Sequence, residues 1–321
     1  MILQSTDRSF LPEEKDIPPL ITLTRGSKLY GGRPVLNEVS MLVRSGTGTA
    51  FIGRNGSGKS TLLSILAGLL RLSAGELTYS REGLTIGYSP EAFPGLKLPA
   101  DDYLHWMGRI AGLSQALTAS RVNELLHAFK LEAFRSRPMA GFSKGMLQKV
   151  NLIQSLLLRP QLLLLDEPMS GLDLPAQHTL TGLLQELKSE GTALVFSVHE
   201  PQTVEALADV VYVLQEGQTI RTIHGAENLR TAPAVYIVSR GLSQADQEAV
   251  KSLPGILSMQ PVPDSAESTC TGITVEPAVS DNCLQQILAA GGSVISVERP
   301  GGISDIAKWM DPKDPNGSAR E

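Results

Sequence analysis

The sequence predicts an α/β fold, a mostly parallel sheet covered by helices, followed by a smaller α+β domain. Short apolar runs at residues 49–52, 84–88, 161–165, 193–198 and 210–214 alternate with longer segments of helical periodicity. This alternation is typical of parallel sheets, whose strands are buried on both faces and read as continuous apolar runs. The pattern changes after Gly217, shortly before the expected start of the second domain.

The first domain is expected to span residues 19–222. Residues 1–18 are polar, and the pair Pro18-Pro19 lies at their end, which favours a flexible N-terminal tail. Between about residues 93 and 160 the alternation of strands and helices is interrupted, with helix-like stretches at 101–110 and 121–129. We interpret this segment as a helical subdomain inserted into the α/β core.

The second domain is expected at residues 223–310, with strands at 235–238, 256–259, 272–275 and 294–297 and helices at 243–253 and 281–290. The resulting order, βαββαβ, is that of the ferredoxin-like fold. Ser243 and Asp246 supply a capping signal for the first helix, and Pro254 ends it. Residues 311–321 have no apolar periodicity and are expected to be disordered.

Composition disfavours several classes of protein. The 321 residues include 28 Lys and Arg against 33 Asp and Glu, and a net charge of −5 offers no basic surface for direct nucleic-acid binding. Cys270 and Cys283 form no CxxC or Cys/His cluster, so neither a disulfide framework nor a zinc site is expected, and a reducing cytoplasm is favoured. The chain has no run of 18 apolar residues and no signal-peptide pattern, so we expect any membrane link to come through a partner.

A phosphate-binding loop is predicted at residues 53–61, GRNGSGKST, because this segment follows an apolar strand and opens an apolar helix. Glycines allow successive N–H groups to converge on phosphate oxygens, and the helix N-terminus adds positive potential. Lys59 is expected to hold the β- and γ-phosphates and Ser60 to ligate Mg²⁺. A glycine-rich turn without a ligand is the alternative, and the flanking strand and helix argue against it. The expected binding residues are Gly53, Arg54, Asn55, Gly56, Ser57, Gly58, Lys59, Ser60 and Thr61.

Two acids and a histidine follow buried strands at the sheet edge where ligands bind in this class of fold. Asp166 and Glu167 come directly after residues 162–165, and successive side chains on a strand point opposite ways, so the two acids can take different tasks. Asp166 is expected to position Mg²⁺ and Glu167 to polarise the attacking water as general base. His199 is expected to reach the γ-phosphate. Alone, an acidic pair is more often a helix cap or a solvated turn, and a histidine there is more often structural.

The segment Phe142 to Met146, FSKGM, has no use inside a single phosphate-binding fold. Its expected use is in a second copy, which predicts an ATP site completed across a dimer interface. Opening and closing of the two copies could then drive another protein.

Taken in order, these motifs resemble the ATP-binding cassette (ABC) ATPases over roughly residues 20–220. GRNGSGKST is similar to the family's Walker A loop, FSKGM to its signature, LLLLDEP to its Walker B motif and residues 170–173 to its D-loop. His199 lies where the family has its switch histidine, and Tyr30 lies where it stacks an aromatic ring on adenine; for a lone tyrosine, simple packing is the alternative. The resemblance implies a P-loop ABC ATPase core with a mixed sheet and a helical subdomain.

The resemblance also implies roles for individual residues. Ser143 and Gly145 would contact the γ-phosphate held by the opposite cassette, and Asp173 of the D-loop would join the nucleotide site. Glu91 stands where the family has a glutamine, and it would contribute to ATP and Mg²⁺ binding with one more negative charge. Lys144 and Met146 replace the commoner Gly and Gln of the signature. The implied catalytic residues are Lys59, Glu167 and His199, and the implied Mg²⁺ ligands are Ser60, Glu91 and Asp166.

A single cassette followed by a small domain, with an SKGM signature and a Pro-Glu before the helical insert, is similar to the ATP-binding subunits of bacterial type-two ABC exporters. This implies an ATPase that uses ATP and Mg²⁺, pairs with a second cassette (itself or a close relative) and works at the cytoplasmic face of the membrane through separate transmembrane permease subunits. One alternative is a soluble ABC ATPase acting on nucleic acid or ribosomes, disfavoured by the single cassette and the short insert. Another is a regulatory module that binds ATP without hydrolysing it, against which Glu167 argues. The sequence identifies no cargo.

Overall fold

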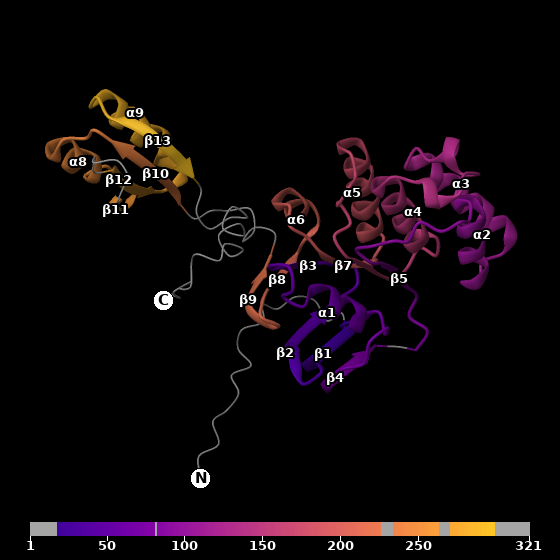
Figure 1. Ribbon diagram of the computed structural model, residues 1–321. Helices are drawn as coiled ribbons and strands as arrows, with labels where there is room; N and C mark the ends of the chain where they lie inside the picture. The colour runs from indigo at the N-terminus through magenta and orange to yellow at the C-terminus, as the bar shows by residue number, and fades with distance from the viewer. Residues whose placement is uncertain (1–17, 81, 226–233, 263–269, 299–321) are drawn as a thin grey trace, which may run out of the picture. The chain divides into compact units, whose positions relative to one another are not determined.

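The computed structural model describes residues 18–80, 82–225, 234–262 and 270–298 (Figure 1). The tails expected at 1–18 and 311–321 lie outside this part, apart from Pro18. The chain divides into two compact units: one holds residues 56–197 and 216–219 with the described residues before 50, and the other holds 50–55, 198–215 and the described residues from 220. The domain boundary at residue 222 stays a prediction.

A six-stranded sheet carries the phosphate-loop strand near its middle, in the order β5-β6-β7-β3-β8-β9. The strands run β3 (Gly48–Ile52), β5 (Ile86–Ser89), β6 (Leu162–Leu165), β7 (Ala193–Ser197), β8 (Val210–Gln215) and β9 (Gln218–His224). Strand β6 pairs in parallel with both β5 and β7. Every residue of β3, β6 and β7 is buried, which explains why these strands read as continuous apolar runs. Parallel pairing brings the carboxyl ends of β5, β6 and β7 to one edge.

A second sheet, which the sequence analysis did not identify, packs three antiparallel strands in the order β2-β1-β4. They are β1 (Ile21–Tyr30), β2 (Arg33–Val43) and β4 (Ala74–Tyr79). The alternation of apolar and polar residues along β1 is broken by register shifts around Gly26, and Arg25 has a positive φ of 47°. Bulges of this kind shift side chains to the other face and so conceal the period of two that identifies a strand.

Six helices accompany these two sheets in the described residues. They are α1 (Lys59–Leu66), α2 (Ala100–Ile110), α3 (Gln115–Ala128), α4 (Lys144–Leu156), α5 (Leu174–Ser189) and α6 (Pro201–Leu207). Helices α2, α3 and α4 pack against one another and form the purple and magenta group on the right of Figure 1. Leu104, Val122 and Ile153 are fully buried in this group. Its position between β5 and β6 in the chain agrees with the expected helical insert.

The C-terminal residues build a four-stranded antiparallel sheet in the order β11-β12-β10-β13. Its elements are β10 (Val235–Arg240), α8 (Gln244–Lys251), β11 (Ile256–Val262), β12 (Cys270–Val275), α9 (Ser280–Ala289) and β13 (Ser293–Glu298). Their order is βαββαβ, within a few residues of the expected bounds, whereas assignment to the ferredoxin-like fold stays a prediction. Ser243 and Asp246 form the expected capping box of α8.

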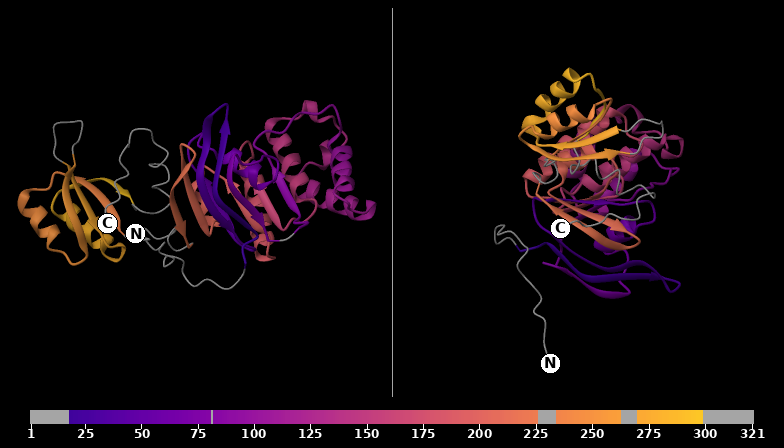
Figure 2. Two further views of the ribbon diagram at one scale, coloured as in Figure 1. Left: turned by 90° about the horizontal axis from the view of Figure 1, so that it is seen from below. Right: turned by 90° about the vertical axis from the view of Figure 1, so that its left-hand side faces the viewer.

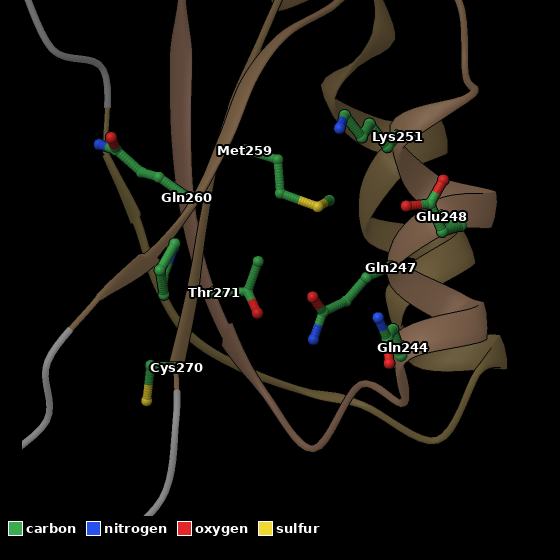
Figure 3. Close-up of a pocket in the computed structure, with 9 residues that line it drawn as sticks. Gln244, Gln247, Glu248, Lys251, Met259, Gln260, Cys270 and Thr271 are labelled. Atoms are coloured by element: carbon green, nitrogen blue, oxygen red, sulfur yellow. The ribbon is translucent and has the colours of Figure 1, made fainter.

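Both C-terminal helices cover the same face of this sheet (Figure 2). Ile237 and Ile273 of the sheet form one buried cluster with Val250 of α8 and with Cys283 and Ile287 of α9. Burial raises the pKa of the Cys283 thiol, so it behaves as an uncharged core group. A hollow of about 260 Å³ lies between α8 and strands β11 and β12 (Figure 3).

Candidate nucleotide-binding site

The phosphate loop takes a backbone shape that only glycine allows at Gly58. This residue has a φ of 104° and directly precedes α1. A Cβ placed there would lie 2.9 Å from the carbonyl oxygen of Val35 and 2.6 Å from Cδ2 of Leu36. Gly56 also has a positive φ, of 82°. The loop is therefore folded tightly against β2, and it leads into a helix N-terminus, which favours negative charge.

Lys59 is buried in the first turn of α1, with only 6% of its surface exposed. Burial lowers its pKa, and the negative charges of Glu167, Asp166 and Glu91 partly oppose that shift. The structure thus brings four of the expected site residues within electrostatic reach of one another. An ammonium group that feels the charges of three carboxylates belongs to a set of groups that can hold a phosphate and a divalent cation together.

Ser57 fits a phosphate ligand. Its side chain is buried, and its Oγ has no hydrogen-bond partner among the described residues. A buried hydroxyl without an acceptor costs free energy unless a ligand or water supplies one, and a phosphate oxygen would do so. The backbone of Ser57 is fixed separately, because Gly217 N donates to its carbonyl oxygen at 3.2 Å and Gly217 O accepts from Asn37 N at 2.8 Å.

The acidic pair lies at the carboxyl end of β6, between the ends of β5 and β7. Asp166 is 2% exposed, and its backbone N donates to the carbonyl oxygen of Ser89 at 2.9 Å. Ser197 Oγ donates to Asp166 Oδ1 at 2.6 Å and accepts from the backbone N of Glu167 at 2.8 Å. One hydroxyl therefore holds both acids. Ser197 was not among the predicted site residues; the signal that could have identified it is a hydroxyl at the end of an otherwise apolar strand.

We expected Asp166 and Glu167 to point opposite ways because they would be successive residues of a strand. Glu167 does not lie on the strand, so that reason was wrong. Strand β6 ends at Leu165, and Glu167 has a left-handed φ of 49°. This conformation is uncommon for a residue with a side chain, and such strain gathers at functional sites. This backbone bend is held by the bond from Glu167 N to Ser197 Oγ.

Glu91 lies just past β5, in an exposed position, and α4 fixes the backbone before it. Asn151 Nδ2 donates to the carbonyl oxygen of Pro90 at 2.6 Å, and Gln154 Nε2 donates to that of Tyr88 at 2.9 Å. Asn151 is fully buried, so its amide serves this contact rather than solvent. The helix that begins at the signature therefore also sets the position of the Glu91 segment.

The signature begins α4 on the surface. Ser143 is the N-cap, and its Oγ accepts from Met146 N at 3.3 Å. Lys144 Nζ donates to Ser170 Oγ at 3.1 Å. A Cβ on Gly145 would lie 2.4 Å from the carbonyl oxygen of Gly171, so the helix start packs directly on the loop that follows the acidic pair. Ser143 and Lys144 remain exposed, as a surface that meets a second molecule requires.

Asp173 has a structural task in this structure. It is the N-cap of α5, with Oδ1 accepting from Ala176 N at 2.9 Å. Its Oδ2 lies 3.8 Å from Lys149 Nζ, and the side chain is 65% exposed. Gln148 Nε2 adds a bond to the carbonyl oxygen of Pro168 at 3.3 Å. A contact of Asp173 with nucleotide stays a prediction.

The remaining expected residues lie at the ends of strands and helices. His199, half-buried, is two residues past β7, and the preceding Val198 N donates to the carbonyl oxygen of Phe51 in β3 at 3.2 Å. Tyr30 ends β1 with 47% of its surface exposed. Gly53 is buried, Thr61 is half-buried, and Arg54, Asn55 and Ser60 are exposed.

Comparison with known proteins agrees with this geometry. The family model for ABC transporters matches residues 36–170. An uncharacterised ABC transporter ATP-binding protein of Methanocaldococcus jannaschii is 34% identical over 204 residues, which cover 63% of this chain and 76% of that protein. The zinc import ATP-binding protein ZnuC of Yersinia pseudotuberculosis is 35% identical over 236 residues, covering 73% and 90%. A solved ATP-binding subunit of an ABC transporter matches with a TM-score of 0.61 and 32% identity, covering 66% of this chain and 92% of that one.

Proposed function

The chain belongs to the ATP-binding proteins of ABC transporters and is an ABC ATPase, and on that premise we propose that it energises export through a separate membrane subunit. Two cassettes would close on ATP and reopen after hydrolysis. The observation that carries this proposal is the buried Lys59, which lies within electrostatic reach of Glu167, Asp166 and Glu91. A lysine surrounded by acids and desolvated by burial is suited to a triphosphate with its divalent cation.

The phosphates of ATP would lie on the loop that ends at α1. Lys59 would pair with the β- and γ-phosphates, and Ser57 Oγ would donate to a phosphate oxygen that satisfies its buried hydroxyl. Ser60 and Asp166 would hold Mg²⁺, with Glu91 as a further carboxylate. These oxygen donors suit a hard cation. When bound, Mg²⁺ neutralises negative charge on the β- and γ-phosphates.

Hydrolysis would depend on Glu167 as the general base. The carboxylate would accept a proton from the attacking water, and the hydroxyl of Ser197, bonded to the Glu167 backbone, would keep it in place. His199 would contact the γ-phosphate from the end of β7. The split of tasks between Asp166 and Glu167 is supported by their different surroundings, since Asp166 is buried and Glu167 is half-buried.

The second cassette would supply the start of its α4. Ser143 and Gly145 would donate from the helix start to the γ-phosphate held opposite, and Lys144 would add positive charge there. The bond from Lys144 to Ser170 supports this arrangement, because it holds the long side chain near the helix start instead of leaving it free in solvent. We propose a homodimer as the simplest form.

A membrane subunit would dock on the helical group. Trp106 and Ile110 are 59% and 78% exposed and lie one turn apart on α2, so they form an apolar strip on one helix face. Among the described residues no helix is long and apolar enough to cross a bilayer. A position at the cytoplasmic face of the membrane, through a separate permease, accounts for both observations. The zinc import relative shows that related cassettes also serve import, so direction belongs to this proposal.

The turnover of a Glu167→Gln variant tests the assignment. We expect ATP hydrolysis to fall by about 10²-fold or more while ATP binding persists, because the amide cannot accept the proton. Glu190→Gln, an exposed residue after α5, is the matched control and should hydrolyse ATP normally. Unchanged hydrolysis in Glu167→Gln would remove the assigned base.

Two other functions are separated by simple outcomes. A regulatory module that binds ATP without hydrolysing it would show no turnover in the wild-type chain. A soluble ABC ATPase that acts on nucleic acid or ribosomes would co-purify with ribosomes and not with membranes. Recovery of the wild-type chain in detergent-solubilised membranes together with one membrane protein is the result that the transporter proposal requires.

A further inference from the structure

Lys28 and Tyr30 lie on the same face of β1, two residues apart, and their side chains meet. Lys28 Nζ is 5.2 Å from the centroid of the Tyr30 ring. The same Nζ donates to the carbonyl oxygen of Arg71 at 2.7 Å. The ammonium group is therefore anchored by a hydrogen bond while it lies over the ring, which is half-exposed at 47%.

The end of β1 is fixed to the segment that follows α1 by two more hydrogen bonds. Leu29 N donates to Ser73 Oγ at 3.0 Å, and Ser73 N donates to the carbonyl oxygen of Ser27 at 2.8 Å. Helix α1 begins at Lys59, so these contacts connect the tyrosine to the helix that carries the phosphate-binding lysine.

The strand that follows Tyr30 packs against the phosphate loop. Tyr30 pairs with Arg33 at the start of β2, and Val35, two residues further on, packs on Gly58. The β1–β2 pair therefore supports the loop and presents the tyrosine. Tyr30 has no ring contact in the described residues other than the one with Lys28.

We propose that Lys28 is a positioning residue that holds the Tyr30 ring in the orientation that receives the adenine base of ATP. This rests on the proposed binding of ATP at the phosphate loop. A cation over one face of an aromatic ring favours a defined ring orientation, and a base can stack on the other face. Because Lys28 is anchored to Arg71, the ring is held before ATP arrives, and less ordering is needed on binding.

The test compares Lys28→Met with the wild-type full chain. Methionine keeps much of the length and the apolar stem of lysine but removes the charge and the donor. We expect KM and Kd for ATP to rise about three-fold, the effect of an exposed cation–π contact, with kcat unchanged. Binding of inorganic tripolyphosphate should not change, because this probe has no base. Lys28→Arg should restore ATP binding, since arginine can also lie over a ring and donate to a carbonyl.

Two controls make the test specific. Lys130→Met removes an exposed lysine from the turn after α3 and should leave ATP binding at the wild-type value. In a Tyr30→Leu background, Lys28→Met should cause no further loss, because the two residues act as one unit. A thermal melt of each variant shows that it is folded, and Lys28→Gln, which also removes the charge, carries the comparison if Lys28→Met is not.

Three outcomes would overturn the inference. ATP binding that is unchanged in a folded Lys28→Met variant removes the role. An equal loss of ATP and tripolyphosphate binding would make Lys28 a direct phosphate ligand. A full additional loss in the Tyr30→Leu background would show that Lys28 does not act through Tyr30. If the wild-type chain binds no ATP at all, that result contradicts the proposed function and not the role of Lys28.

Discussion

Ser197 Oγ donates to Asp166 Oδ1 over 2.6 Å while it accepts the backbone N–H of Glu167. A side chain at the end of β7 thus connects the expected Mg²⁺ ligand to the expected base. Because the hydroxyl is fully buried, water cannot easily replace these bonds.

Ser197→Ala should therefore lower kcat by about ten-fold, or roughly 1.4 kcal/mol, because the buried Asp166 carboxylate and the Glu167 backbone N–H each lose the bond to this hydroxyl. Steady-state ATPase kinetics check this. Ser155→Ala, which removes another buried hydroxyl that bonds a backbone carbonyl in α4, is the control and should keep kcat near the wild-type value. A normal kcat in Ser197→Ala would mean that the hydroxyl does not orient the acidic pair.

Two glycines should respond in opposite ways to alanine. Gly145→Ala places a Cβ 2.4 Å from the carbonyl oxygen of Gly171, so the helix start must move and ATP-dependent pairing of cassettes should weaken. Gly182→Ala lies inside α5 with no atom within 4 Å of its Cβ, and it should raise the free energy of unfolding by about 0.5–1 kcal/mol. Urea unfolding and ATP-dependent dimerisation measure the two effects. If Gly145→Ala dimerises with ATP as well as Gly182→Ala does, the packing described at Gly145 is contradicted.

ATP affinity should fall at alkaline pH. Burial lowers the pKa of Lys59, and only the ammonium form attracts phosphate. ATP should therefore bind with full affinity at pH values below the lowered pKa of Lys59. Affinity should be lost as pH rises through that pKa, at a lower pH than for an ordinary lysine. Equilibrium titrations with ATP at increasing pH, with circular dichroism to verify folding, test this. Affinity that is constant across the alkaline range would show that Lys59 keeps its charge there.

Trp106→Glu should separate docking from catalysis. A charge in the exposed apolar strip of α2 should reduce the amount of membrane subunit that co-purifies about ten-fold, or roughly 1.4 kcal/mol, while basal ATPase activity persists. Leu69→Glu, at a residue 65% exposed after α1, is the matched control. Capture that is normal in Trp106→Glu would place the permease contact elsewhere.

The parts of the fold that follow simple periodicity were predictable from sequence. Strands β3, β6 and β7 are buried on both faces, so their apolar runs identified them within a residue or so. Strand β1 was not identified, because the bulge at Arg25 and Gly26 breaks its alternation. Spacing along one chain carries no information about such a shift.

Candidate site residues could be chosen from sequence where a motif prescribes chemistry, as in the phosphate loop, and their binding roles stay predictions. The supporting contacts were not. Asn151 and Gln154 bond backbone carbonyls more than 60 residues away, and these bonds depend on how α4 packs rather than on any local pattern. The left-handed backbone of Glu167 is equally a product of its tertiary surroundings, since glutamate has no preference for it.

The claim that two copies share each ATP site is tested most directly by the solution mass of Glu167→Gln with ATP and Mg²⁺. The account predicts a dimer, with twice the mass of one chain. Adding Ser143→Arg to this variant should return the chain to a monomer that still binds ATP, because the nucleotide that Ser143 would contact is the one held by the opposite copy. A Glu167→Gln chain that binds ATP as a monomer, or a double variant that still dimerises, would contradict the account.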